Sequence, residues 1–166
     1  MKPIKESMIA DISRNGYLGV ERKIPQEERK EARKRYANLA ISIWLHAVAS
    51  DNYQKVLERK KVLDFIKLLF QEGSLFPEPE YSDSDQKKIL MELVAITDLI
   101  SLDAIAEYLS DKKEIALAFF HDACLIVFLD GRVVSTENDF LESIAGKFAL
   151  SKMDKEKILE QFRKNL

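Results

Sequence analysis

The chain contains little cysteine, glycine or proline, and each scarcity excludes a class of fold or site. Its 166 residues include one cysteine, five glycines and four prolines. A single thiol, Cys124, permits neither an internal disulfide nor a cysteine-based zinc site. Its apolar neighbours predict that it is a small buried hydrophobe rather than a reactive thiol. The scarcity of turn-forming residues disfavours a fold built from many tight β-turns.

The chain also lacks an excess of charge of one sign and lacks a long apolar run. The formal net charge is −2, which gives no reason to expect nucleic acid or an anionic membrane as a partner. His121 and Asp122 interrupt the best apolar run, which therefore falls short of the roughly 20 residues that a membrane span needs. The first residues lack the apolar core of a signal peptide. We therefore expect a cytoplasmic protein that is not an integral membrane protein.

The sequence contains apolar residues at helical spacing. Apolar residues make up 46% of the chain and charged residues 33%, an ordinary globular composition. Apolar positions recur at helical spacing along most of the chain, and no convincing alternation of period two occurs. The sequence predicts an all-α fold, a compact bundle of about seven to eight helices. The expected helices lie at about 2–15, 25–50, 55–71, 83–100, 101–109, 115–129, 135–148 and 151–163.

The domain organisation follows from these segments. Residues 1–24 are expected to form an N-terminal arm with a short helix, which Asn15-Gly16 would end, and to be accessory to the core. Residues 25–166 are expected to form one helical domain, because a chain of this length suffices for one buried core. The segment Ile115–Phe148 organises it: an almost wholly apolar helix, an Asp-Gly break, a polar turn and an amphipathic helix.

The long helix predicted at 25–50 changes character along its length. Its first half is a charged face, with Glu31 at helical spacing from Lys34 and Arg35. Its second half is apolar nearly all round, as in a buried central helix. Asn38, Ser42 and His46 fall four residues apart there and make one polar strip. We expect the strip to meet water or a buried hydrogen-bond partner.

The two halves of the domain repeat one pattern. Shifting the sequence by 79 positions places Asp51 on Asp130 and Glu58 on Glu137, and it aligns the apolar positions of the helices that follow. Each copy therefore has an apolar helix, an aspartate, a break, a short turn and a glutamate early in an amphipathic helix. We expect hairpin repeats at about 36–71 and 115–150, related by pseudo-two-fold symmetry and packed against each other.

The four repeated acids have a structural and a functional interpretation. Structurally, carboxylates at a turn and at a helix start accept backbone N–H bonds and complement the helix dipole. Functionally, Asp51, Glu58, Asp130 and Glu137 are candidate ligands of a hard divalent cation, Ca²⁺ or Mg²⁺. The second copy is not an EF-hand, because Leu141 occupies the twelfth position counted from Asp130.

The second copy, LIVFLDGRVVSTENDFLESIAGKFALS, resembles the Asp-Gly-x5-Glu hairpin of the tellurite-resistance TerB-like family. The first copy, AVASDNYQKVLERKKVLDFIKLL, is similar to the same hairpin, with Asn52 in place of the glycine. The resemblance implies a compact helical domain with internal symmetry, a bacterial stress context and metal binding at the hairpin acids. It favours a non-enzymatic binding or interaction module with a protein partner, and it leaves a homo-oligomer open.

Two alternative functions remain open at this stage. A metal-dependent hydrolase would use the same acids with His46 or His121. The sequence offers no His-Glu-x-x-His, phosphate-binding glycine loop or Gly-x-Ser-x-Gly in its favour. The segment 21–35, with seven basic and four acidic residues, is a candidate phosphate-binding helix. Because acids are interleaved with the bases, we interpret it as a solvated face rather than a nucleic-acid site.

Overall fold

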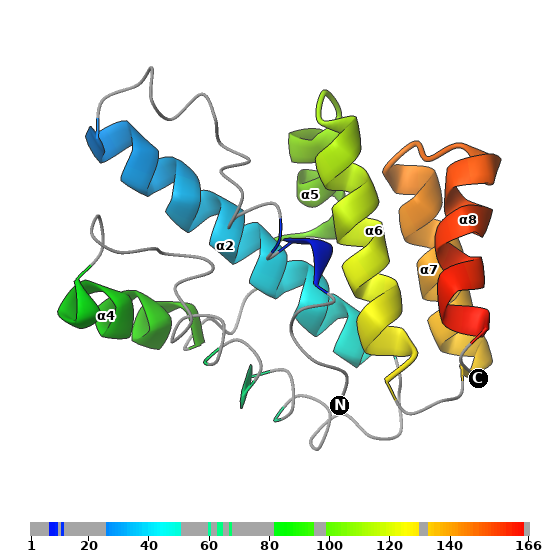
Figure 1. Cartoon of the computed structure of the whole chain (residues 1–166), viewed down its shortest axis with the longest axis horizontal. Coiled ribbons are helices and arrows are strands. Elements are labelled where there is room, and N and C mark those ends of the chain that lie inside the picture. The colour runs from blue at the N-terminus through cyan, green and yellow to red at the C-terminus, as the bar shows by residue number, and fades with distance from the viewer. Residues whose placement is uncertain are drawn as a thin grey trace.

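The computed structural model describes residues 7–9, 11, 26–50, 60, 63–64, 67, 82–94, 99–129 and 133–164. These residues contain no strand, so the predicted all-α class is confirmed for this part of the chain. Six helices run through it (Figure 1): α2 (Gln26–Ala49), α4 (Asp83–Val94), α5 (Leu102–Leu109), α6 (Lys113–Val127), α7 (Ser135–Lys147) and α8 (Lys152–Arg163). Residues 60, 63, 64 and 67, within the helix predicted at 55–71, are also helical.

Helix α6 is central to the described structure. It packs against α2, α5, α7 and α8, and Figure 1 shows it between α2 and the α7–α8 pair. All but three of its residues are buried, as the almost wholly apolar sequence predicts. Cys124 is fully buried among them, which confirms its predicted role as a small hydrophobe. Helix α6, the most apolar segment of the sequence, therefore forms the centre of the core.

The second half of α2 supplies the other side of this core. Tyr36 and Trp44 are among the largest fully buried side chains, and the Tyr36 ring meets the edge of the Phe119 ring on α6 with centroids 6.0 Å apart. In the first half, Glu31 and Arg35 are exposed whereas Arg33 is buried. Lys34 there pairs with Glu92 of α4 at 3.0 Å, and its hydrogen bond and charge hold the pKa of Glu92 below its usual value. Such an exposed pair adds little stability.

The N-terminal arm contacts the core directly. Met8, Ile9 and Asp11 are helical, and the Asp11 N–H donates to the Ser7 carbonyl at 3.1 Å. Ile9 is fully buried in the hydrophobic core, and the Tyr36 hydroxyl donates to its carbonyl at 2.9 Å. The expectation that the arm is accessory is therefore wrong for these residues, because Ile9 is part of the core. The predicted stop at 15–16 lies outside the described residues.

The segment before α5 differs from the prediction. Helix α4 ends at Val94, and Ile100 lies outside any helix, whereas the sequence predicted one helix extending to Ile100. The Ile100 backbone is bonded instead to side chains of α2. Ser101 then caps α5 as predicted, its Oγ accepting the Ala104 N–H at 3.1 Å.

The last two helices begin and end much as the sequence predicts. The Ser151 hydroxyl accepts the Asp154 N–H at 3.1 Å and so caps α8, whose Ile158, Leu159 and Phe162 are buried. Helix α7 ends in a left-handed residue, Ala149, with φ 54°. The Leu150 N–H donates to the Ala145 carbonyl at 3.0 Å, which is the 6→1 bond of a Schellman motif.

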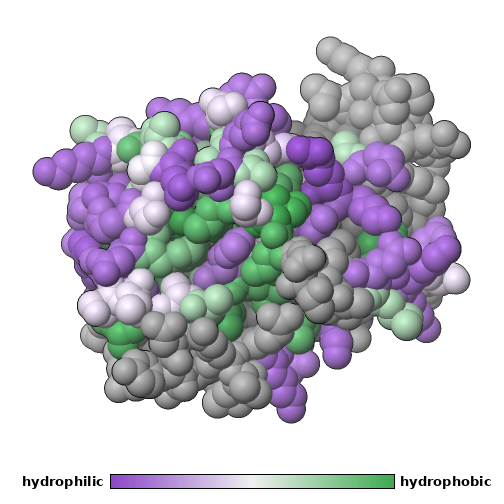
Figure 2. Space-filling view, turned by 180° about the vertical axis from the view of Figure 1, so that it is seen from behind, coloured by the Kyte–Doolittle hydropathy of each residue, from purple (hydrophilic) through white to green (hydrophobic). Residues whose placement is uncertain are grey.

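The described helices also define the surface. None of them is long and apolar enough to cross a membrane. Figure 2, seen from behind, shows a largely hydrophilic surface with apolar residues exposed in the middle of that face. Met91 and Met153 are 71% and 79% exposed, so two large apolar side chains of α4 and α8 lie outside the core.

Ala149→Gly should raise the free energy of unfolding by about 0.5–1 kcal/mol. A residue with a Cβ is strained in the left-handed region, and this relief exceeds the entropy that glycine adds to the unfolded chain. Urea unfolding measures the change. Ala149→Ser, which keeps a Cβ, is the control and should give no gain. An equal or lower stability for Ala149→Gly would contradict the assigned backbone conformation.

Candidate functional site

Glu137 is the one of the four predicted metal ligands that the structure describes. Asp51, Glu58 and Asp130 lie outside the described residues, so the convergence of the four acids stays a prediction. Within the described part of the chain, no group of three or more histidine, cysteine, aspartate or glutamate side chains is close enough together to hold a metal ion. A cation site at the hairpins would therefore need the acids outside this part.

Glu137 lies in the first turn of α7, as the sequence predicts. Its side chain is 2% exposed, and Oε1 accepts the Val134 N–H at 3.0 Å. This bond satisfies one of the backbone donors that a helix start leaves unpaired, and the negative charge complements the helix dipole. Because valine has no polar side chain, the reciprocal bond of a capping box is missing. Glu137 thus performs the structural role that one of the two interpretations assigns to it.

The polar strip on α2 binds backbone. His46 Nε2 lies 2.8 Å from the Ile100 carbonyl, and because a carbonyl only accepts, this nitrogen carries the proton. The Ser42 hydroxyl accepts the Ile100 N–H at 3.1 Å. The prediction of buried hydrogen-bond partners is therefore confirmed for these two positions. Asn38, one turn earlier, has a buried Oδ1 with no hydrogen-bond partner among the described residues.

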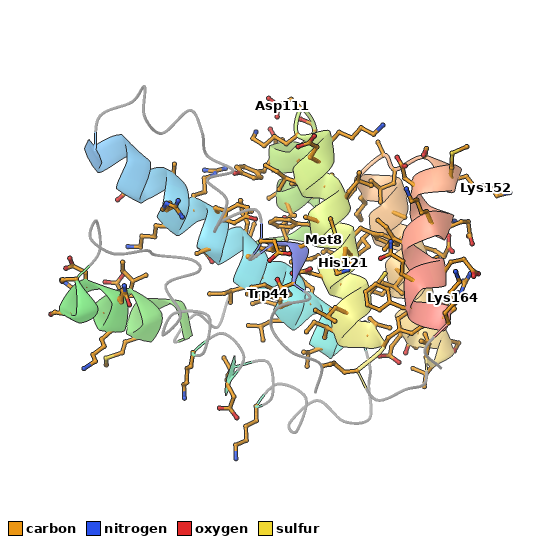
Figure 3. The ribbon with its side chains drawn as sticks, in the orientation of Figure 1. Met8, Trp44, Asp111, His121, Lys152 and Lys164 are labelled. Carbon is orange, nitrogen blue, oxygen red and sulfur yellow. The ribbon has the colours of Figure 1, made fainter. Side chains whose placement is uncertain are left out.

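A cluster of buried polar groups surrounds Asp122, which lies on α6 and is fully buried. Asp122 Oδ2 accepts from the Ser7 hydroxyl at 2.6 Å and from Trp44 Nε1 at 3.1 Å. Oδ1 accepts from the Met8 N–H at 2.9 Å and from His121 Nδ1 at 3.0 Å. Figure 3 shows Met8, Trp44 and His121 near one another, where the N-terminal segment meets α2 and α6. We call these five residues the Asp122 cluster.

The Asp122 cluster has a clear physical role. Burying a carboxylate is costly unless hydrogen bonds replace the lost water, and four donors do so here. The Met8 N–H belongs to the first turn of the short N-terminal helix, where a negative charge is favoured by the dipole. Asp122 therefore caps, from α6, a helix that lies more than a hundred residues away in the sequence.

The geometry of the Asp122 cluster is not that of a nucleophilic triad. In a triad the serine hydroxyl donates to the imidazole, and the aspartate orients the imidazole from its other side. Here Ser7 and His121 both donate to the same carboxylate. The His121 ring also packs against Phe162 of α8, with centroids 5.0 Å apart. The prediction that His121 and Asp122 are core polar residues is confirmed.

Two members of the Asp122 cluster were missed by sequence reasoning. Ser7 lies in an arm that seemed accessory, and Trp44 lies in a helix that is apolar nearly all round. The sequence does contain a signal for this cluster. An aspartate within an apolar run is expected to be buried, and a buried polar group needs hydrogen-bond partners. Trp44 carries the only indole N–H of the chain, and this donor needs an acceptor when buried.

A groove of about 650 Å³ lies along α2 near the start of α5. The Arg35 guanidinium borders it, with Cζ 5.7 Å from the Tyr108 ring centroid, and forms no ion pair with any described residue. Cation–π contact with the ring positions the guanidinium without neutralising it. The described lining comprises Glu31, Ala32, Lys34, Arg35, Asn38, Leu39, Ile100 and Ala104.

Asp122→Asn should lower the free energy of unfolding by about 2–4 kcal/mol. The amide NH₂ would face a donor, because all four partners of Asp122 donate, and at least one of them would remain buried and unpaired. Urea unfolding followed by Trp44 fluorescence measures the loss. Asp111→Asn, at a side chain that is 79% exposed, is the control and should stay within about 0.5 kcal/mol. Equal effects of the two substitutions would refute the role of the cluster.

Tyr36→Phe should flatten the alkaline loss of stability. Burial, and then the charge of Asp122, raise the pKa of Tyr36 far above its usual value. The unfolded chain therefore ionises first, so the stabilisation is present below about pH 10 and is lost as the pH rises further. Loss of the bond to Ile9 should also cost about 1 kcal/mol near neutral pH. Urea unfolding from about pH 7 to about pH 11 tests this, and equal alkaline slopes for both proteins would contradict it.

Comparison of the chain with protein-family models, with curated proteins and with solved structures finds no match.

Proposed function

We propose that this chain is a non-enzymatic binding or interaction module of the TerB-like kind, acting in the cytoplasm in a bacterial stress context. Its hairpin carboxylates Asp51, Glu58, Asp130 and Glu137 bind a divalent cation, Ca²⁺ or Mg²⁺. The bound cation sets the relative position of the two hairpins and so tunes the binding of a protein partner. Such a cation would relieve the electrostatic cost of clustered acids.

The observation that carries this proposal is the position of Glu137. Its carboxylate is almost fully buried at the start of α7, seven positions after Asp130 in the sequence. Helices α6 and α7, which would form the second hairpin, pack against each other, and this packing supports the proposal. A buried carboxylate with a second acid seven positions earlier in the sequence fits the preference of hard cations for oxygen ligands.

The internal repeat belongs to the same proposal. The first copy, at about 36–71, would present Asp51 and Glu58 as the second presents Asp130 and Glu137, within a bundle of about seven to eight helices. The packing of α2 against α6 supports this arrangement, because these two apolar helices are the first helices of the two copies. Pseudo-symmetric hairpins bury such helices against each other.

The hydrolase alternative depends on His46 and His121, whose surroundings the structure describes. His46 and His121, the candidate bases of a hydrolase, donate to a backbone carbonyl and to a buried carboxylate. No observation favours the hydrolase over the binding module.

Calorimetric titration with Ca²⁺, Mg²⁺, Mn²⁺ and Zn²⁺ tests the proposed cation. The wild-type protein should give saturable heat with Ca²⁺ or Mg²⁺, and Asp130→Ala/Glu137→Ala should abolish it. Glu137→Gln separates the two roles of this residue, because its amide oxygen still accepts the Val134 N–H while the charge is lost. This variant should therefore keep most of its stability and lose at least tenfold in cation affinity, about 1.4 kcal/mol.

The matched control for the cation titration is Glu142→Gln, an exposed acid on the same helix that pairs with Lys155 at 2.8 Å. It should leave the cation affinity unchanged. Absence of measurable heat with all four ions would remove the cation from the proposal. Equal losses in Glu137→Gln and Glu142→Gln would show that the affinity depends on net charge rather than on a site.

A further inference from the structure

We infer that the surface of α2 and α6 around Asp122 is a receptor for a short motif of a partner protein: a serine, any residue, then an isoleucine. Residues 7–9 of this chain, which we call the Ser-Met-Ile segment, occupy this receptor as an internal competitor. Such a receptor gives the proposed binding module its class of partner, and it rests on that proposed function.

The Ser-Met-Ile segment is bound through one polar group of each residue. The Ser7 hydroxyl donates to Asp122 Oδ2 at 2.6 Å, and the Met8 N–H donates to Oδ1 at 2.9 Å. The Ile9 carbonyl accepts from the Tyr36 hydroxyl at 2.9 Å, and the Ile9 side chain is fully buried. The N–H and the carbonyl are present in any sequence, so only the serine and the isoleucine specify the motif.

Helices α2 and α6 position the receptor groups without the segment. Trp44 donates to Asp122 Oδ2 at 3.1 Å, and His121 donates to Oδ1 at 3.0 Å. The Tyr36 ring meets the edge of the Phe119 ring, with centroids 6.0 Å apart. Each carboxylate oxygen has two lone pairs, so one donor from the helices leaves room for one donor from a bound segment. A site positioned in advance binds its ligand at a lower ordering cost.

The segment is related to the receptor as a ligand would be. Its bonds to Asp122 span 115 and 114 positions of the sequence, and its bond to Tyr36 spans 27. It lies where α2 and α6 meet, with the side chain of Met8 partly exposed (Figure 3). None of these bonds depends on residues that adjoin the segment in the sequence. A segment of another chain with the same motif can therefore make them.

The charge of the receptor selects an unmodified hydroxyl residue. Asp122 is fully buried, and among the described residues its only ion-pair partner is His121. Alanine in place of the serine would leave the buried carboxylate short of a donor. Phosphoserine, aspartate or glutamate would place a second negative charge beside it, which is unfavourable at low dielectric.

The internal segment lowers the affinity of the intact chain for such a partner. A covalently attached ligand is present at a high effective concentration, so a partner motif has to displace it. The isoleucine of the partner then takes the place of Ile9 and restores the buried apolar contact. The Ser-Met-Ile segment is thus an autoinhibitory contact.

The test uses the full chain and a labelled, end-blocked nonapeptide with the sequence of residues 5–13, KESMIADIS. Fluorescence anisotropy compares wild type with Ser7→Ala/Ile9→Ser, which weakens the internal segment. The double variant should bind the peptide saturably and roughly tenfold or more tightly than wild type does. Met8→Leu is the matched control within the segment. It should bind as wild type does, because the receptor bonds to the Met8 N–H.

Peptide versions test each contact on the double variant. Alanine or phosphoserine in place of the serine should weaken binding roughly tenfold or more, because each removes a bond to a buried carboxylate. N-methylation of the methionine removes its N–H and should have a similar effect. Leucine in place of the methionine should leave the affinity unchanged.

Hydrogen exchange on wild type decides the question independently of whether the double variant folds. The Met8 N–H should exchange at a lower opening free energy than the N–H groups in the middle of α6, which open on global unfolding. An excess of the unlabelled nonapeptide displaces the internal segment and should speed the exchange of the Met8 N–H. The exchange of α6 should not become faster.

Three results would overturn the inference. The first is equal protection of the Met8 N–H and of the middle of α6. The second is a folded double variant that binds the nonapeptide no more tightly than wild type, and the third is equal binding of the serine and phosphoserine peptides. Any of these with intact cation binding removes the receptor alone. Failure of both the peptide and the cation assays removes the binding module.

Discussion

The structure depends on one buried carboxylate. Asp122 lies in the middle of the most apolar helix of the chain, and four hydrogen bonds replace the water that it loses there. Two of its partners come from the N-terminal segment, one from α2 and one from α6 itself. The carboxylate therefore joins three segments that are distant in the sequence, and it does so with directional bonds that apolar packing alone does not provide.

Helix α2 also joins segments that are distant in the sequence, and it does so through several polar side chains. Its aromatic residues Tyr36 and Trp44 bond to the arm and to Asp122. Ser42 and His46 bond to the backbone of Ile100 and so place the segment that leads into α5. These four side chains of α2 thus bind backbone or a carboxylate.

The sequence predicts some of these features well and others not at all. Local sequence patterns suffice for the helical class, for the burial of α6 and of the apolar face of α8, and for the caps at Ser101 and Ser151. These features depend on neighbours within a few residues. The partners of Asp122 depend on contacts across most of the chain. Local patterns therefore indicate that Asp122 and Trp44 need hydrogen-bond partners, but not which ones. The local pattern predicts that Ile100 lies in a helix. This prediction fails for the same reason, because the bonds of the Ile100 backbone to side chains of α2 outweigh the local helical pattern. Glu137 was placed correctly in the first turn of α7, whereas its role as a cation ligand depends on distant acids and remains a proposal.

The most direct test of the central claim is hydrogen exchange at the indole N–H of Trp44, the single tryptophan of the chain. This proton is donated to Asp122 in a site with no solvent exposure. It should therefore exchange only when the protein unfolds globally, with a protection free energy equal to that measured by urea unfolding. Exchange on the time scale of an exposed indole, in protein that is otherwise folded, would contradict the account.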